Sequence, residues 1–327
     1  MISIIIPMKN EAEGLSVLFT QLLPNLENCH QSFEIIAVND GSTDHTLQRL
    51  LELQKSIPAL RIVDLSRNFG KEAALTAGMA AARGQAAIPI DADLQDPTDL
   101  IPQLIAKWEE GYEMVIAARD DRSQDSLFKR AFSQIFYSIF NLFSNTRLVP
   151  NAGDFRLFDR KFIDAFLSLP ERTRFNKGLF AWLGFRSCII THSRPERAVG
   201  KSKWSYRKLW QFAVDGITSF SAVPLKMFSY LGFLTATCAL LYGIYIVINT
   251  LLYGNNVPGY PSLIALILFF GGLNMIGIGI MGEYISRIFT ETKQRPLYVI
   301  RQHYNSLNAA AQQTSCSKTP LRAPAKQ

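Results

Sequence analysis

Short apolar runs alternate with helical patterns along the first third of the chain. The apolar runs end in turn signals or polar residues and predict five strands, over residues 3–6, 33–38, 60–65, 86–90 and 114–118. Helical patterns cover residues 13–27, 44–54, 71–82 and 100–109, the second with Ser42 or Thr43 as its cap. Strands that alternate with helices in this way predict βαβ units and a mostly parallel sheet.

A different pattern occupies the last third. Between Met227 and Gly282 the sequence contains no Asp, Glu, Lys or Arg. A membrane-spanning helix needs about 20 apolar residues, so this stretch predicts two spans, at about 228–252 and 263–282, joined by helix breakers. A buried helical hairpin of a soluble protein is the alternative, but such a helix rarely runs so far without a polar face. Basic residues flank both ends of the stretch and the turn has no charge, which predicts that both ends are cytoplasmic.

These patterns divide the chain into three parts. We expect a cytosolic domain over 1–224, a transmembrane hairpin over 225–285, and a cytosolic C-terminal segment over 286–327 that is disordered after about residue 303. Within the first part, segments at about 127–145 and 203–222 combine aromatic with basic residues and predict amphipathic helices at the bilayer interface. Ordinary helices that pack on the sheet remain the alternative for both.

Composition narrows the classes of function. The chain has a formal charge of +7, which suits nucleic acid, anionic lipid or phosphorylated substrates without choosing among them. The four cysteines are far apart and form no CxxC, which argues against a zinc site or a disulfide framework and fits a reducing compartment. The first apolar run is too short for a signal peptide and has no basic stretch before it, so we expect a cytosolic start.

Polar residues follow the ends of the predicted strands. In parallel sheets, ligands bind beyond the carboxyl ends of the strands, and here these ends lead to Lys9–Glu11, Asp40, Ser66–Asn68, Asp91 with Asp93, and Arg119. Two carboxylates one residue apart can bind a hard divalent cation and leave room for phosphate oxygens, although Asp96-Pro97 also resembles a helix start with capping aspartates. No GxGxxG follows the first strand and no GxxxxGK[ST] is present, which argues against a dinucleotide site and a P-loop.

The ordered motifs IIPMKNE, VNDGSTD, LSRNFGKEAAL, IDADLQDP, GDFRLFDR and GKSKW resemble glycosyltransferase family 2. With the hairpin and the phrase YPSLIALILFFGGLNMIGIGIMGEYISRIFTETKQRP, the chain is similar to the polyprenyl-phosphate glycosyltransferases, which include dolichyl-phosphate mannose synthase, and most similar to bacterial bactoprenol glucosyltransferases. The resemblance covers about residues 2–300. It implies an α/β fold of the GT-A type, with a Rossmann-like, mostly parallel sheet followed by interfacial helices and the hairpin. One departure is Asn39, where many members have Asp.

The resemblance also implies roles for particular residues. The residues implied to bind the nucleotide sugar are Pro7, Lys9, Glu11, Val38, Asp40, Asp91, Ala92, Asp93, Gln95, Arg119, Lys201 and Lys203. Those implied to bind Mg²⁺ or Mn²⁺ are Asp91, Asp93 and Gln95, and those implied to meet the acceptor phosphate are Arg119, Lys129, Arg130 and Arg197. Asp154, with Asp93 and Arg119, belongs to the implied catalytic set as base or positioning group; a structural acid paired with Arg156 is the alternative.

The activity implied is inverting transfer of a sugar, glucose from UDP-glucose first, to undecaprenyl phosphate at the cytoplasmic face of a bacterial inner membrane, for glycan or O-antigen modification of lipopolysaccharide. The implied partners are the nucleotide sugar, the polyprenyl phosphate, the bilayer and further copies of the chain, with no nucleic acid. GDP-mannose, UDP-galactose, UDP-N-acetylhexosamine and UDP-4-amino-4-deoxyarabinose remain open as donors. A processive polysaccharide synthase is disfavoured by the absence of QxxRW, and a non-catalytic membrane scaffold by the acidic residues.

Overall fold

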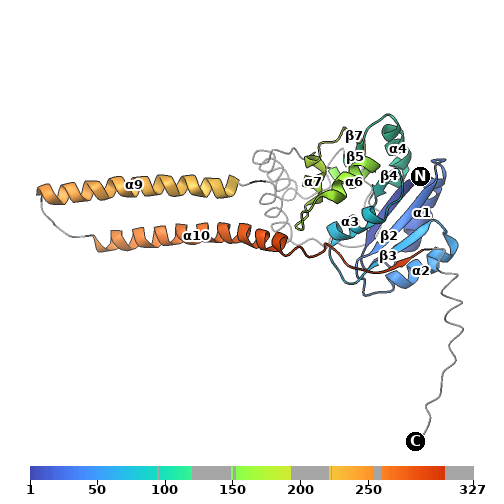
Figure 1. Cartoon of the computed structure of the whole chain (residues 1–327), viewed down its shortest axis with the longest axis horizontal. Coiled ribbons are helices and arrows are strands. Elements are labelled where there is room, and N and C mark those ends of the chain that lie inside the picture. Colours follow the sequence, from blue (N-terminus) through green and yellow to red (C-terminus); the bar gives the residue numbers. More distant parts are fainter. Residues whose placement is uncertain are drawn as a thin grey trace, which may run out of the picture.

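In a computed structural model, the N-terminal part of the chain forms a mixed β-sheet (Figure 1). The structure describes residues 1–93, 96–119, 149, 152–192, 221, 223–253 and 259–305. Eight strands among them form one sheet in the order β7-β5-β6-β4-β1-β2-β3-β8. Their bounds are β1 Ile2–Met8, β2 Phe33–Asn39, β3 Leu60–Leu65, β4 Ala86–Pro89, β5 Met114–Arg119, β6 Ala152–Asp159, β7 Ser187–His192 and β8 Ile300–Tyr304.

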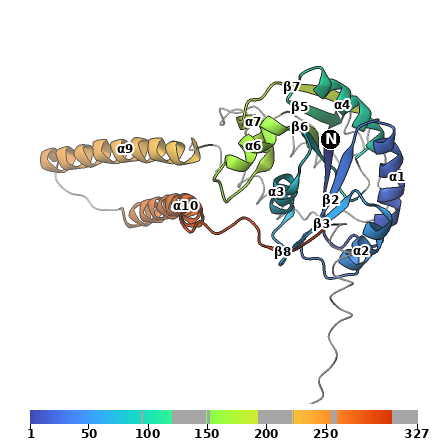
Figure 2. The same cartoon turned by 45° about the vertical axis from the view of Figure 1, so that its right-hand side comes forward.

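Helices cover both faces of this sheet (Figure 2). Their bounds are α1 Leu15–Glu27, α2 Thr46–Ser56, α3 Lys71–Ala81, α4 Ile101–Glu109 after the short turn η1 Thr98–Leu100, α6 Arg160–Ser168 and α7 Asn176–Trp182. Residues of α1, α2 and α4 form one apolar cluster with the sheet, and residues of α3, α6 and α7 form the other. Ile4 and Ile6 belong to the first cluster and Ile5 to the second, and all three are fully buried. This burial on both faces explains the continuous apolar runs of the central strands.

The five strands and four helices predicted for the first third of the chain are confirmed to within two residues at each end. The predicted cap of the second helix is wrong. That helix, α2, begins at Thr46, and the Asp44 carboxylate accepts a hydrogen bond of 3.0 Å from the Thr46 amide. Ser42 and Thr43 instead accept hydrogen bonds from Asn10 of the β1–α1 loop, so their side chains are not available to α2.

Three strands are absent from the predictions, namely β6, β7 and β8. Both β6 and β8 are antiparallel to their neighbours, whereas β1, β2, β3 and β4 are parallel to one another and β5 is parallel to β7. The strand β8 lies in the segment assigned to a separate C-terminal part, and it extends to Tyr304, just past the predicted onset of disorder. It joins the edge of the sheet beside β3, so the sheet includes residues from both ends of the chain.

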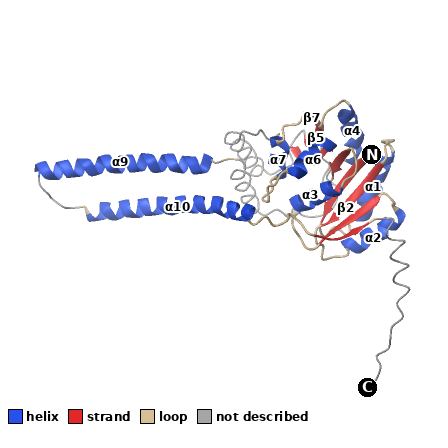
Figure 3. Cartoon of the chain, viewed as in Figure 1, coloured by secondary structure: helices blue, strands red, loops and turns tan. Residues whose placement is uncertain are grey.

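Two long helices extend away from the sheet side by side (Figure 1; helices are blue in Figure 3). They are α9, Val223–Tyr253, and α10, Tyr260–Thr292, so both predicted helices are present and longer than predicted. Within the described part of the chain, one stretch, Leu225–Tyr253, is long and apolar enough to cross a membrane. The sequence predicted two such spans. The second helix continues beyond Gly282 into polar turns that carry Glu283, Arg287 and Glu291.

Candidate active site

A lysine lies between two aspartates beyond the carboxyl end of β4, an inner strand of the sheet. Lys71 Nζ lies 2.6 Å from Asp91 Oδ1 and 2.6 Å from Asp154 Oδ2. Asp91 follows the carboxyl end of β4, and Lys71 is the first residue of α3. Asp154 belongs to β6, which runs antiparallel to β4, so the beginning of β6 comes to the end of β4. We call these three residues the carboxylate–lysine cluster.

Opposite charges determine the protonation of Asp154 and Lys71, whereas burial raises the pKa of Asp91 despite the charge of Lys71. Burial by itself would raise the pKa of Asp154, but the charge of Lys71, and next that of Lys177, outweighs burial and lowers the pKa of Asp154 below its usual value. Burial by itself would lower the pKa of Lys71, yet Asp154 and Asp91 raise it well above its usual value. Asp154 and Lys71 are therefore both charged near neutral pH. The cluster partner of Asp154 is Lys71, and Arg156 is a weaker influence on its pKa.

A third carboxyl group, that of Glu72, lies next to the cluster. Burial, and then the charge of Asp154, raise the pKa of Glu72 to about 7. Glu72 is the second residue of α3, and its carbonyl oxygen accepts a hydrogen bond of 3.4 Å from the side chain of Asn176, the first residue of α7. Lys177 follows and donates to the Ala152 carbonyl at 3.5 Å. The start of α7 therefore contacts both α3 and β6, the elements that carry Lys71 and Asp154.

Asp40 supports the position of Lys71. Its two carboxylate oxygens accept hydrogen bonds from the amides of Phe69, at 2.7 Å, and Gly70, at 3.0 Å. Gly70 has a φ of +97°, a conformation that side chains with a Cβ rarely adopt. Asp40 is buried, and it fixes the turn that immediately precedes Lys71. Its contact with a nucleobase stays a prediction, beside this observed structural role.

Asn39, the departure from the family pattern, contacts a buried acid. Its side-chain nitrogen donates a hydrogen bond of 2.7 Å to Asp64 Oδ1, and Asp64 is 1% exposed. Asn39 Oδ1 accepts a hydrogen bond from the Ser42 amide, so both ends of the amide group are used. The other oxygen of Asp64 lies 3.4 Å from a guanidinium nitrogen of Arg301 on β8. An aspartate at position 39 would replace this donor by a second acid.

We expect Asn39→Asp to lower the free energy of unfolding by about 1–3 kcal/mol at pH 7. Two carboxylates in contact raise each other's pKa, so the cost is full above the raised pKa of the folded pair. It shrinks as pH falls toward the usual pKa of an aspartate and one group takes a proton. Thermal unfolding in detergent between pH 4 and pH 8 measures this change. The double variant Asn39→Asp/Asp64→Asn reverses the hydrogen bond and should recover most of the loss. Equal stability of the single variant and the wild type would contradict the expectation.

The other predicted nucleotide residues lie at neighbouring strand ends. Pro7 of β1 and Val38 of β2 are paired in register, and the ends of these strands lie between β4 and β3. Val38 is fully buried, so its side chain belongs to the core. Lys9 is exposed and Glu11 half-buried in the loop that follows β1. The sheet thus places the predicted residues that follow β1, β2 and β4 side by side at the carboxyl ends of these parallel strands.

The three predicted metal ligands, Asp91, Asp93 and Gln95, are placed only in part. Asp91 and Ala92 are described with Asp93, which is half-buried, and Ala92 is 7% exposed. Among the described residues, no group of three or more His, Cys, Asp or Glu side chains could hold a metal ion. Arg119 is the last residue of β5 and lies opposite His192 of β7. The two amphipathic segments also lie outside the described part of the chain, apart from residue 221. The remaining predicted residues that lie outside it are Gln95, Lys129, Arg130, Arg197, Lys201 and Lys203.

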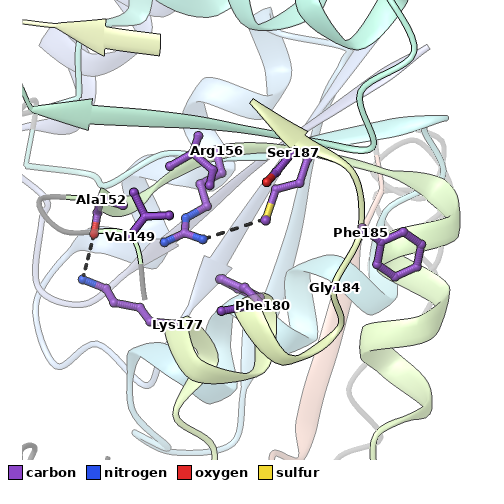
Figure 4. Close-up of a pocket in the computed structure, with 11 residues that line it drawn as sticks. Val149, Ala152, Arg156, Lys177, Phe180, Gly184, Phe185 and Ser187 are labelled. Carbon is purple, nitrogen blue, oxygen red and sulfur yellow. Dashed lines mark hydrogen bonds between the residues drawn. The ribbon is translucent and has the colours of Figure 1, made fainter. Parts of the chain in front are cut away.

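A pocket of about 170 Å³ lies between α7 and the strands β5, β6 and β7 (Figure 4). Arg156 and Lys177 line it, and the charges of both lower the pKa of Asp154. Arg156 is 4% exposed, and its guanidinium lies 5.4 Å from the centre of the Phe180 ring. Apolar side chains that include Met114, Ile116, Phe180 and Phe185 complete the lining. The pocket therefore combines buried positive charge with an apolar wall beside Asp154.

Residues 3–167 match the family model described as glycosyl transferase family 2. The chain belongs to glycosyl transferase family 2. Residues 223–288 match a second model, the GtrB C-terminal hairpin. The expected GT-A class of α/β fold is confirmed, since the family domain corresponds to the mixed, mostly parallel sheet described above.

Relatives of this glycosyltransferase align along most of their length. An uncharacterized glycosyltransferase of Synechocystis sp. is 48% identical, over 91% of this chain and 94% of its own length. A prophage bactoprenol glucosyl transferase homolog of Escherichia coli is 44% identical over 92% of this chain and 98% of its own. Among solved structures, the mannosyltransferase PcManGT of Pyrobaculum calidifontis, in complex with GDP-Man and Mn²⁺, is 16% identical over 90% of this chain and 86% of that chain, with a TM-score of 0.41.

Sequence reasoning missed three residues that the structure brings to the site of this glycosyltransferase. Lys71, Glu72 and Lys177 all act on the protonation of Asp154 or are influenced by it. Lys71 and Glu72 lie within the motif LSRNFGKEAAL, so a signal for them was present in the sequence. Lys177 lies in no such motif, and only the packing of α7 on β6 indicates it.

Proposed function

We propose that the chain transfers glucose from UDP-glucose to a polyprenyl phosphate, undecaprenyl phosphate, with inversion at the anomeric carbon. The observation that carries this proposal is the joining of a family 2 domain to a GtrB hairpin in one chain. A bactoprenol glucosyl transferase of Shigella phage SfV is 45% identical over 92% of this chain and 98% of its own. The carboxylate–lysine cluster at the sheet edge supplies the chemical part of the proposal.

The acceptor nucleophile is an oxygen of the lipid phosphate. A phosphate monoester has a second pKa of about 6, so it is largely a dianion near pH 7 and needs no strong base. The harder task is to bring this dianion beside the diphosphate of the donor. Positive side chains beside Asp154, which are Lys71, Arg156 and Lys177, reduce that repulsion. Arg119, Lys129, Arg130 and Arg197 complete the proposed acceptor set.

Asp154 acts in this proposal as a positioning group or weak base. Its carboxylate is ionised because Lys71 lowers its pKa, and it lies at the strand end beside Asp91. A single displacement by the phosphate oxygen inverts the anomeric centre, with no sugar bound covalently to the enzyme. The departing group is the nucleoside diphosphate, which Lys9, Lys201 and Lys203 are proposed to contact together with Pro7, Glu11, Val38, Asp40 and Ala92.

A divalent ion fits the donor set of the β4 loop. Mg²⁺ is usually bound by one or two carboxylates together with substrate phosphates, and Asp91 and Asp93 offer two carboxylates next to the proposed diphosphate site. We propose Asp91, Asp93 and Gln95 as its protein ligands. The ion would neutralise charge that develops on the leaving diphosphate. In the structure, the positive charge paired with Asp91 is that of Lys71, whose Nζ lies 2.6 Å from Asp91 Oδ1.

The long helices suit a bilayer as their surroundings. Leu251 is 80% exposed, Phe233 76% and Phe269 63%, far more apolar surface than a protein leaves to water. We propose that α9 and α10 insert together into a bacterial inner membrane, with the sheet domain and both termini on the cytoplasmic side. The hairpin would bring the site to the anchored lipid phosphate. Gly277 packs against Phe228 of α9, while Gly271, Gly272, Gly279 and Gly282 are open and could serve contacts between copies of the chain.

The test is transfer of radiolabelled sugar to undecaprenyl phosphate in detergent, from a panel of UDP- and GDP-sugars, with Mg²⁺ or EDTA. We expect transfer from UDP-glucose in the wild type with Mg²⁺, and loss with EDTA and in Asp93→Ala. Transfer from GDP-mannose, UDP-galactose or another donor of the panel would correct the sugar. No transfer in a folded sample would overturn the proposal, and a product that retains the donor's anomeric configuration would overturn the single displacement.

A further inference from the structure

The end of the hairpin is tied to the sheet domain by one carboxylate. Glu291, in the last turn of α10, accepts hydrogen bonds from the amide of Arg172 at 2.8 and 3.0 Å and from the amide of Thr173 at 2.9 Å. Both amides belong to the loop between α6 and α7. A negative charge at a helix C-terminus is unfavourable because the helix dipole is negative there. The hydrogen bonds from the two amides compensate this unfavourable interaction, so the contact depends on the carboxylate of Glu291 at this position.

The loop that Glu291 contacts leads directly into the active site. Two residues after Thr173, Phe175 is 3% exposed in the core, and Asn176 and Lys177 then begin α7. Asn176 is fully buried and donates to the carbonyl of Glu72. Lys177 donates at 3.5 Å to the carbonyl of Ala152, two residues before Asp154 in β6, and its charge lowers the pKa of Asp154. Because so few residues separate the amides from Lys177, a shift of the loop moves the positive charge beside Asp154.

The chain after Glu291 contacts the loop that precedes Lys71, the other lysine of the site. It continues to Val299, whose carbonyl accepts a hydrogen bond of 2.9 Å from the amide of Ser66, and then pairs as β8 with β3. Arg301 donates to the carbonyl of Ser66 at 2.7 Å. Ser66 begins the turn that ends at Gly70, immediately before Lys71. One short segment of chain, 291–304, therefore contacts the two loops that lead into α7 with Lys177 and into α3 with Lys71.

We propose that Glu291 is a positioning residue, which docks the membrane hairpin on the loop 171–175 and so holds Lys177 beside Asp154. The hairpin is then part of the active-site geometry as well as an anchor. The charge that Lys177 contributes near Asp154 depends on this docking. The inference rests on the proposed function only for its kinetic readout, since the position of Lys177 can be measured without any sugar transfer.

The test compares Glu291→Ala and Glu291→Gln with a matched control, Glu283→Ala. Glu283 lies on the same helix and pairs with Arg287 at 3.0 Å. We expect faster amide hydrogen exchange over residues 171–177 and faster acylation of Lys177 by a water-soluble amine reagent in Glu291→Ala, both measured by mass spectrometry on the full chain. The rate constant of transfer at saturating donor should fall about 10- to 100-fold, with the donor KM unchanged. Glutamine keeps one acceptor oxygen, so its effects should be smaller.

Each readout can overturn the inference. Unchanged exchange and Lys177 acylation in Glu291→Ala would refute the docking, whatever the activity. Faster acylation with an unchanged transfer rate constant would leave Glu291 a structural role and refute its positioning role. The same changes in Glu283→Ala would show a general loosening of α10 and refute the specific contact. Absence of transfer in the wild type would overturn the proposed function alone, because exchange and acylation still decide whether Glu291 positions Lys177.

Discussion

Asp154→Asn is expected to lower the rate constant for sugar transfer by at least about 100-fold, within the range of a lost acid–base or charged positioning group. Asparagine has the same shape but lacks the charge that Lys71 stabilises in the wild type. The donor KM should change little, since the predicted nucleotide residues lie at the other strand ends. Single-turnover transfer at saturating donor and acceptor, followed over time, measures the rate constant.

Asp164→Asn is the matched control for this substitution. Asp164 lies on α6, is 63% exposed and forms a 3.5 Å surface pair with Arg160. An exposed pair of this kind contributes about 0–1 kcal/mol, so the control should keep wild-type transfer and stability. If Asp154→Asn transferred sugar within about threefold of the wild type, the carboxylate would have no part in the chemistry, and its pairing with Lys71 would be structural.

Lys71→Met is expected to lower the free energy of unfolding by about 1–2 kcal/mol at pH 7 and to abolish most transfer. Removing one partner of a fully buried pair costs about 3–5 kcal/mol, and the smaller value applies because the Lys71 side chain is 43% exposed. The substitution leaves Asp91 and Asp154 without the cation that lies between them. Thermal unfolding in detergent and the transfer assay measure the two effects.

The difference in the free energy of unfolding between the wild type and Lys71→Met should depend on pH in a defined direction. Lys71 lowers the pKa of Asp154 in the folded protein, so their pairing stabilises the fold above the usual pKa of an aspartate, about 3.9. That contribution is lost as pH falls toward the lowered folded value. The two proteins should therefore differ fully at pH 7 and converge below about pH 4. Lys107→Met, which removes a surface pair with Glu110, is the control, and a pH-independent difference would contradict the account.

The early part of the fold could be predicted from local pattern alone. Strands β1 to β5 are apolar runs buried on both faces, and such runs carry a strong signal wherever they occur. β7 and β8 carry a weaker one: their residues alternate between exposed and half-buried, and β8 reads IRQHY. Each forms because a partner strand offers its edge, and for β8 that partner lies far away in the sequence. No local pattern encodes that pairing.

The candidate site follows the same division. The sequence by itself determined that Asp40, Asp91 and Asp93 follow strand ends and that Asp154 lies in a family motif. It also determined that a long stretch without charged residues lies near the C-terminal end of the chain. Only the tertiary structure decided that Lys71 lies between Asp91 and Asp154, that Lys177 approaches from α7, and that Glu291 docks on the loop before it. The physical reason is that apolar periodicity is a property of neighbouring residues, whereas charge pairing is fixed by the order and direction of strands that the whole chain must fold to establish.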